Sequence, residues 1–162
     1  MYVDASDGSK NELGVAANGG LLEDQDLNLT ADKSWKKTEM DWAIVPWGLR
    51  KLLEWIHEKY DSPKIYITEN GCAFDDKKID GEVNDVERIA FYDGYIKECH
   101  NAISKGINVK GYFAWSFMDN FEWASGYQKR FGLHHVDFET LERTPKASSK
   151  WFAELIAKNG LD

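Results

Sequence analysis

A short strand-like run ends in residues that a strand does not need for its own stability. Residues 65–68 are β-branched and aromatic, which favours a buried strand, and Glu69, Asn70 and Gly71 follow directly. The C-terminal ends of parallel strands carry the catalytic groups of α/β proteins, so Glu69 is a candidate catalytic carboxylate. Gly71 lets the chain turn sharply out of the strand. The common alternative for a lone glutamate there is a solvated or hydrogen-bonded scaffold residue.

A second apolar run, 109–116, ends at Trp115-Ser116 and precedes a loop that contains Glu122 and Trp123. Neighbouring parallel strands lie about 5 Å apart, so the ends of the two runs should face one mouth. Pyranose rings present C–H faces that stack on indole rings, and their hydroxyls bind carboxylate oxygens. These residue types favour a sugar site, with packing in a barrel core as the alternative role for Trp115 and Trp123.

The hydrophobic pattern predicts the elements that would hold these two runs in place. Apolar residues at helical spacing predict a helix over 46–60, with Pro46 at a favourable first position. Asn84 and Glu87 resemble a capping box for a second helix that stops at 105–106. Strand, helix and strand in this order predict a parallel sheet and an α/β fold. The expected apolar face of the second helix consists of Ile89, Tyr92, Ile96, Cys99 and Ile103. The other expected elements are a loop over 117–130, a hairpin over 131–141 and a last helix opened by Thr144-Pro145 and ended by Asn159-Gly160.

Several longer motifs resemble the C-terminal part of family 1 glycoside hydrolases, the β-glucosidase family. The motifs are ITENG at 67–71, WSFMDNFEW at 115–123, GY at 126–127, RFG at 130–132 and VD at 136–137. From Trp42 to the end, the resemblance covers roughly three quarters of the chain. It implies the C-terminal portion of a (β/α)8 TIM barrel, an incomplete barrel in which the two runs are about strands seven and eight.

By this resemblance, Glu69 is the nucleophile that attacks the anomeric carbon and forms a covalent glycosyl-enzyme. The resemblance also implies substrate-binding roles for six residues. They are Asn70 beside the nucleophile, Trp115 beneath the glycone ring, Glu122 on two sugar hydroxyls, Trp123 as an indole N–H donor, Phe131 closing the glycone pocket and Trp42 stacked on the aglycone. A carboxylate at the position of Glu122 repels a 6-phosphorylated sugar, so the expected small-molecule partner is a neutral β-glycoside. No cofactor and no metal is implied.

The acid/base motif of the family, Thr-x-Asn-Glu-Pro, is absent, because the three prolines follow Val45, Ser62 and Thr144. A retaining glycosidase needs this second carboxylic acid about 5–5.5 Å from its nucleophile. We therefore expect the nucleophile-bearing fragment of a retaining β-glycosidase, a single partial-barrel domain over 1–162. Within it, 1–34 is expected to be an irregular surface segment and 35–162 the C-terminal βα units. The alternative is a non-catalytic carbohydrate-binding or vestigial barrel fragment.

Two parallel strands with open edges expose apolar faces and unpaired backbone groups. This predicts self-association or pairing with a complementary barrel fragment. A net charge of −8 without clustered basic residues argues against nucleic acid as a partner. No apolar run is long enough to span a bilayer and no secretory leader is recognised, so no membrane partner is expected.

Cys72 and Cys99 form neither a disulfide framework nor a zinc-ligand spacing, which fits a reducing compartment and predicts a cytoplasmic location. A metal or redox site that combines these cysteines with His134 and His135 is the weaker alternative, because alternation along a strand sends adjacent rings to opposite faces. The acidic residues of 75–85 predict a solvated loop. They are Asp75, Asp76, Asp80, Glu82 and Asp85.

Overall fold

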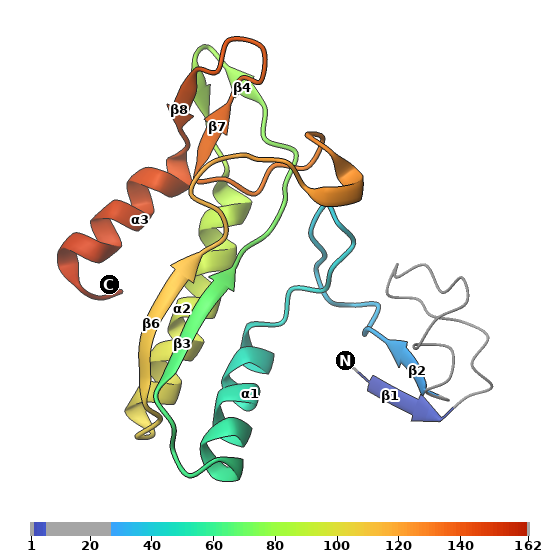
Figure 1. Ribbon diagram of the computed structural model, residues 1–162, viewed down its shortest axis with the longest axis vertical. Helices are drawn as coiled ribbons and strands as arrows, with labels where there is room; N and C mark the ends of the chain where they lie inside the picture. The colour runs from blue at the N-terminus through green and yellow to red at the C-terminus, as the bar shows by residue number, and fades with distance from the viewer. Residues whose placement is uncertain (1, 6–26, 162) are drawn as a thin grey trace. The chain divides into compact units, whose positions relative to one another are not determined.

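The computed structural model describes residues 2–5 and 27–161 (Figure 1). The chain divides into two compact units, Met1–Ile44 and Val45–Asp162, and each is described here by itself. The expectation of one domain over the whole chain stays a prediction.

The first unit contains more regular structure than its composition suggests. Strands β1 (Tyr2–Ala5) and β2 (Leu27–Thr30) pair antiparallel, with Tyr2 opposite Thr30. The prediction of an irregular surface segment over 1–34 is therefore wrong for these two strands, and its central part, 6–26, lies outside the described residues. These strands form through backbone pairing between residues that are distant in the sequence, and the local hydrophobic pattern gave no sign of them.

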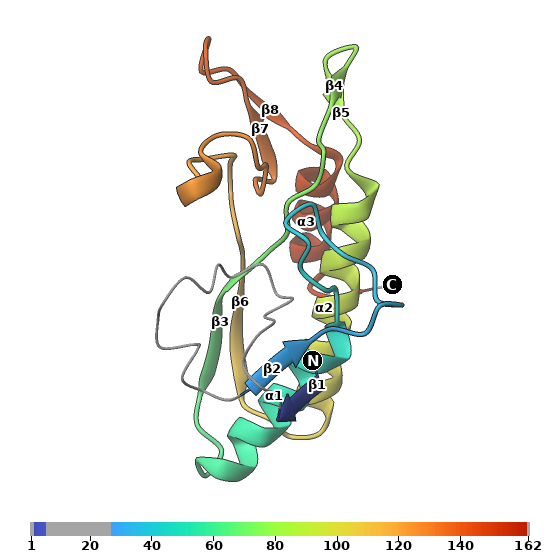
Figure 2. The ribbon, with the colours of Figure 1, turned by 90° about the vertical axis from the view of Figure 1, so that its right-hand side faces the viewer.

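A parallel pair of strands forms the centre of the second unit, as predicted. Strand β3 (Ile65–Asn70) pairs with β6 (Val109–Ala114), and the register ends with Asn70 opposite Ala114. Helix α1 (Pro46–Lys59) precedes β3, and α2 (Val86–Ser104) connects β3 to β6. The two views show α1 and α2 on the same side of the strand pair (Figures 1 and 2). The α/β layering is therefore confirmed for this unit.

The core lies between this helical layer and the sheet. Leu53 of α1 and Cys99 and Ala102 of α2 are buried in one cluster with Ile107. The partly buried residues that pack against it are Leu49, Ile65, Ile67, Val109 and Tyr112. Ile65 and Ile67 alternate along β3, as expected of residues on one face of a strand. Val109 and Tyr112 of β6 are three residues apart, because the register shifts between Ile65, opposite Val109, and Tyr66, opposite Gly111.

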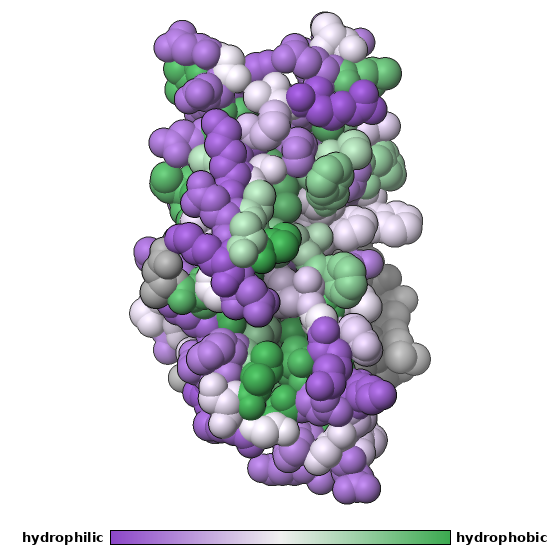
Figure 3. All heavy atoms as spheres, turned by 90° about the vertical axis from the view of Figure 1, so that its left-hand side faces the viewer, coloured by the Kyte–Doolittle hydropathy of each residue, from purple (hydrophilic) through white to green (hydrophobic). Residues whose placement is uncertain are grey.

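The opposite face of the sheet is open within the described part of the chain. Tyr66 and Phe113 are each 56 % exposed, although both are large and apolar. Gly111 leaves room for the Tyr66 ring, because a Cβ at this position would lie 2.8 Å from the Tyr66 Cδ1 atom. Apolar side chains also reach the surface in the lower half of the face shown in Figure 3. Ile103 of α2 is 49 % exposed. Exposed apolar area of this kind is typical of surfaces that further structure covers.

Helix α2 differs from its prediction at the start and along its buried side. It begins at Val86 with Asp85 as its cap residue and without a side-chain capping bond, so the capping box of Asn84 and Glu87 is wrong. Tyr92 and Cys99 are buried as predicted, but Ile103 is exposed. Arg88 is fully buried on this side of the helix, because its guanidinium pairs with Asp76 of the loop after β3 and with Asp85, the cap residue of α2.

The segments after the two strands form short hairpins and a final helix. Strand β7 (His134–Val136) pairs with β8 (Arg143–Pro145), so the hairpin extends beyond the predicted 131–141. Thr144 and Pro145 belong to β8, and α3 (Ala147–Lys158) starts later than predicted; it ends with Asn159 in the left-handed conformation. Strands β4 (Lys78–Ile79) and β5 (Glu82–Val83) form a small hairpin, and η2 (Trp123–Ser125) is a 3-10 turn. Among the described residues, no helix has the length and apolar character that a membrane crossing requires.

Burial of both cysteines gives a prediction about their reactivity. Burial raises the pKa of the Cys72 thiol to about 12 and that of Cys99 to about 11. Because the thiolate is the reactive form, we expect neither thiol to react with Ellman's reagent at about pH 8 in the folded chain. Both should react in denaturant, which serves as the control. Rapid labelling of either thiol in the folded chain would contradict the placement of that cysteine.

Candidate active site

The ends of β3 and β6 are held directly against one another. The amide of Trp115 donates to the carbonyl oxygen of Asn70 at 2.8 Å. A Cβ at Gly71 would lie 1.6 Å from the carbonyl oxygen of Trp115, so only glycine permits this approach. Glu69 and Trp115, predicted from two separate runs, therefore lie at neighbouring strand ends.

The two residues that end β3 differ in how they are held. The Tyr112 hydroxyl donates to Oδ1 of Asn70 at 2.5 Å, which fixes the amide and leaves its NH2 group for another acceptor. Burial raises the pKa of Tyr112, so this hydroxyl stays a neutral donor. Glu69 is exposed, and its carboxylate has no hydrogen-bond or ion-pair partner among the described residues. Such a carboxylate is available to a ligand.

Glu122 and Trp123 lie on a tight turn in the loop after β6. The amide of Glu122 donates to the carbonyl of Gly126 at 2.6 Å, and the amide of Ser125 donates to the carbonyl of Glu122 at 2.8 Å. Trp123 is 81 % exposed. Partial burial raises the pKa of Glu122, and no described residue pairs with its carboxylate. The turn thus presents a carboxylate beside an uncovered indole.

Aromatic packing supports this turn from one side. The rings of Phe121 and Tyr127 meet edge to face with centroids 5.6 Å apart, and Tyr127 lies 4.5 Å from Phe138. The Arg130 guanidinium lies over the Phe138 ring at 5.1 Å from its centroid. These contacts tie the turn to the segment after β7, so its shape does not depend on its own backbone hydrogen bonds alone.

Trp115, Phe131 and Trp42 are placed differently from one another. Trp115 is 36 % exposed, and its carbonyl accepts a hydrogen bond from the Tyr92 hydroxyl at 3.2 Å. The Phe131 carbonyl accepts from the Ser116 amide at 3.1 Å, but only 3 % of Phe131 is exposed, so its side chain packs inside the chain. Trp42 belongs to the separate unit 1–44. The substrate-binding roles of all three stay predictions.

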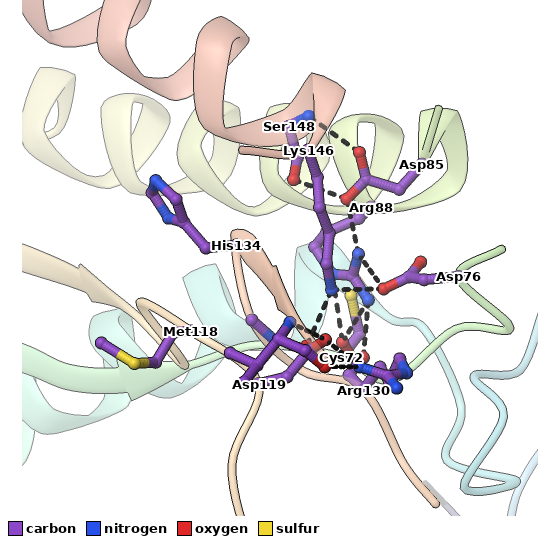
Figure 4. A network of polar contacts seen from close by, with 12 residues as sticks. Cys72, Asp76, Asp85, Arg88, Met118, Asp119, Arg130, His134, Lys146 and Ser148 are labelled. Atoms are coloured by element: carbon purple, nitrogen blue, oxygen red, sulfur yellow. Dashed lines mark hydrogen bonds and ion pairs between the residues drawn. The ribbon is translucent and has the colours of Figure 1, made fainter. Parts of the chain in front are cut away.

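Behind the strand ends lies a buried ionic network that the sequence did not predict (Figure 4). Asp76 and Asp85 belong to it with side chains 2 % and 0 % exposed, so the prediction that the acidic residues of 75–85 form a solvated loop is wrong for these two. Asp75, Asp80 and Glu82 are exposed as predicted. One signal was present: Arg88 precedes the buried Tyr92 by one helical turn, a position that usually holds an apolar residue.

Asp119 accepts hydrogen bonds from four groups in this network. Lys146 Nζ lies 2.8 Å from its Oδ1 atom, and Arg130 Nη1 lies 2.7 Å from Oδ2. The amides of Gly132 and Val136 donate to the same carboxylate at 2.9 and 3.3 Å. Burial opposes its ionisation, but the charge of Lys146 and these hydrogen bonds outweigh burial, and the pKa of Asp119 lies below its usual value.

Arg88 and Lys146 connect the rest of the network. Arg88 Nη1 lies 2.7 Å from Asp76 and 2.5 Å from Asp85, and its Nη2 donates to the carbonyl of Arg130 at 2.7 Å. Lys146 Nζ also lies 2.5 Å from Asp76. Burial raises the pKa of Asp76 and outweighs both cations, and burial lowers the pKa of Lys146. The remaining carboxylate contacts come from Ser148, whose amide and hydroxyl donate to Asp85 at 2.8 and 2.6 Å.

A concavity on the described surface has a lining that includes no residue of these strand ends. It encloses about 470 Å³ and is lined by β5 and the first turns of α3, including Trp151 and Glu154. None of the predicted site residues lines it. We therefore locate the candidate site at the strand ends, where the predicted residues lie, and not at this concavity.

The family model for "Glycosyl hydrolase family 1" matches residues 5–161. This chain belongs to glycosyl hydrolase family 1. The resemblance stated from the motifs at 67–71 and 115–123 is thereby confirmed. The family 1 chain is an α/β fragment that matches part of the barrel structures of the family.

Known relatives show how much of a family member this chain represents. It is 46 % identical to beta-glucosidase A of Thermotoga maritima over 132 residues, which cover 81 % of this chain and 30 % of that protein. It is 44 % identical to human lactase/phlorizin hydrolase over 140 residues, 85 % of this chain and 7 % of that one. The solved beta-glucosidase of Thermotoga maritima in complex with deoxynojirimycin superposes with a TM-score of 0.81 at 43 % identity, covering 85 % of this chain and 31 % of that chain. The family 1 chain is thus truncated relative to its relatives.

The contact between Gly71 and Trp115 leads to a first prediction for the site. In Gly71→Ala, the added Cβ should force the strand ends apart and lower the free energy of unfolding by at least about 2 kcal/mol. Urea unfolding measures this loss, and faster exchange of the Trp115 amide should accompany it. Gly160→Ala is the matched control, because a Cβ there meets no atom within 4 Å. Equal stability of the two variants would contradict the close approach.

Asp119 leads to a second prediction, with a defined pH dependence. Asp119→Asn leaves Lys146 and Arg130 without their shared charge partner, and we expect a loss of about 3–5 kcal/mol at neutral pH. Because the folded pKa lies below the usual 3.8, ionised Asp119 contributes stability above that value and loses it as pH falls through the folded pKa. The stability difference between wild type and variant should therefore shrink below about pH 4.

Urea titrations at several pH values provide the measurement. Asp93→Asn, which removes the surface pair with Lys97, is the control and should cost only about 0.3–0.5 kcal/mol. A wild-type advantage over Asp119→Asn that stays constant down to about pH 2 would contradict the assignment of this stability to the ionised carboxylate.

Proposed function

We propose that this chain carries the nucleophile and much of the glycone site of a retaining β-glycoside hydrolase of the β-glucosidase type. The observation that supports it most is the exposed, unpaired Glu69 carboxylate at the end of β3, beside the end of β6 that carries Trp115. Membership of the family supports the same role. We further propose that β3 and β6 are strands seven and eight of the barrel.

In the proposed reaction, Glu69 attacks the anomeric carbon, and the bond from that carbon to the aglycone oxygen breaks. A covalent glycosyl-enzyme forms, and water then hydrolyses it with retention of configuration. A second carboxylic acid must protonate the leaving oxygen from about 5–5.5 Å away. No motif for that acid occurs in this sequence, so it must come from residues outside the sequence.

The glycone would be held by the residues around the mouth. Glu122 would bind two hydroxyls, since its carboxylate is partly buried and has no protein partner among the described residues. Trp115 would stack beneath the ring, Trp123 would donate its indole N–H, and Asn70 would donate its free NH2 group. Phe131 would close the glycone pocket. The substrate class is a neutral β-glycoside, in keeping with the deoxynojirimycin complex of the Thermotoga maritima relative.

The open sheet face supports a proposal about what completes the site. Tyr66 and Phe113 would line the barrel interior, covered by the six further strands that this sequence lacks. A complementary barrel polypeptide would supply those strands together with the acid. Self-association through the same face is the alternative.

A mass-resolved labelling experiment tests the nucleophile. A 2-deoxy-2-fluoro-β-glucoside with a 2,4-dinitrophenolate leaving group needs little acid assistance, and its fluorine slows hydrolysis of the adduct. We expect release of dinitrophenolate and a glycosyl adduct on the peptide that contains Glu69. Glu69→Gln should abolish both, whereas Glu58→Gln, an exposed position on α1, should change neither.

Two outcomes would count against the proposal. An adduct on a different carboxylate would reassign the nucleophile. Binding of the glycoside without an adduct, seen as quenching of tryptophan fluorescence, would favour the non-catalytic carbohydrate-binding fragment.

A further inference from the structure

We propose that Lys146 is a positioning residue that holds the loop after β3 against the loop after β6, and so sets Glu69 and Glu122 relative to one another. This inference rests on the proposed function for its catalytic meaning. Its structural content, the coupling of two loops by one buried ammonium group, can be tested without activity.

The contacts of Lys146 reach both loops from a third segment. Lys146 lies between β8 and α3 and is fully buried. Its ammonium bonds Asp76 at 2.5 Å and Asp119 at 2.8 Å. Asp76 belongs to the loop that continues from Glu69, and Asp119 to the loop that continues to Glu122. Among the described residues, no other side chain pairs with carboxylates from both loops.

Removal of this ammonium would divide the network along the boundary between the loops. Asp76 would keep Arg88, which lies 2.7 Å away on α2. Asp119 would keep Arg130 and the amide of Gly132, all within the loop after β6. Each half would stay locally paired, and the Arg88 hydrogen bond to the Arg130 carbonyl would be the remaining link within the network. The loops should therefore lose their mutual position before they lose their own structure.

Desolvation explains why this link is specific to one geometry. A buried ammonium loses its hydration and is tolerated only where its hydrogen bonds and charge are matched. Two carboxylates supplied by different segments match it only when both segments are in place. The ammonium charge of Lys146 is therefore fully compensated only when the two loops are correctly spaced.

Native-state hydrogen exchange on the full chain tests the coupling. In Lys146→Met, we expect amides of 71–77 and 117–133 to exchange about tenfold faster or more, while amides of α1 and the β3–β6 pair change little. Lys146→Arg should restore much of the protection, because a cation can again reach both carboxylates. Lys150→Met, one turn later on α3 and exposed, should resemble wild type. If Lys146→Met fails to fold, Asp76→Asn replaces it, because it removes the carboxylate that pairs with Lys146 in the loop after β3. We expect the same exchange pattern from that variant.

Two results would overturn the proposal. Faster exchange confined to α3 would show that Lys146 anchors only the start of that helix. An equal increase at every amide, including the β3–β6 pair, would show a general loss of stability without coupling between the loops.

Labelling of Glu69 by the fluoroglycoside provides the catalytic readout. For Lys146→Met, we expect the first-order labelling constant to fall about tenfold, and Lys146→Arg to recover it. An unchanged constant despite faster loop exchange would overturn the effect on Glu69. Failure of the wild-type chain to label would count against the proposed function, while the exchange pattern would still decide whether Lys146 couples the two loops.

Discussion

The candidate site depends on the mutual compensation of buried charges in the segments that follow β3 and β6. Asp76, Asp85 and Asp119 are buried together with Arg88 and Lys146, and Arg130 closes the group at its edge. A buried charge without a partner costs several kcal/mol, so segments from four parts of the chain must meet for any of them to fold well. Because Asp76 and Asp119 belong to the loops that follow β3 and β6, this network connects the two loops next to the candidate catalytic and binding groups.

The arrangement separates two kinds of carboxylate. Those behind the strand ends are paired, whereas Glu69 and Glu122 have no partner among the described residues. Paired charges make a rigid support, and the unpaired carboxylates at the strand ends remain available to a ligand. The face with Tyr66 and Phe113 exposed belongs to a chain that spans about 30 % of the length of beta-glucosidase A of Thermotoga maritima.

Local sequence predicted the elements that depend on short-range pattern. The helix from Pro46, the strand that carries Glu69 and the stop after 104 are confirmed. The parallel partner strand is confirmed as well, but it ends at Ala114 and not at the predicted Ser116. The errors fall where distant contacts compete with local signals. Asp85 is the cap residue of α2, but its side chain makes no capping hydrogen bond to the amides of α2. Its carboxylate binds Ser148 and Arg88 instead. Likewise, pairing of β8 with β7 extends the hairpin through Pro145 and delays the start of α3.

Sequence motifs were enough to identify the family and most of the candidate residues, because ITENG and WSFMDNFEW keep those residues close together along the chain. The contact between the two strand ends that bear Glu69 and Trp115 required the folded chain, because it depends on the hydrogen bond from the Trp115 amide to the Asn70 carbonyl and on the missing Cβ of Gly71. The tertiary structure alone also revealed the ionic network, since Asp76, Asp119 and Lys146 are far apart in sequence and polar enough to be taken for surface residues. Burial of a charge is a property of its surroundings in space, and no run of neighbouring residues encodes it.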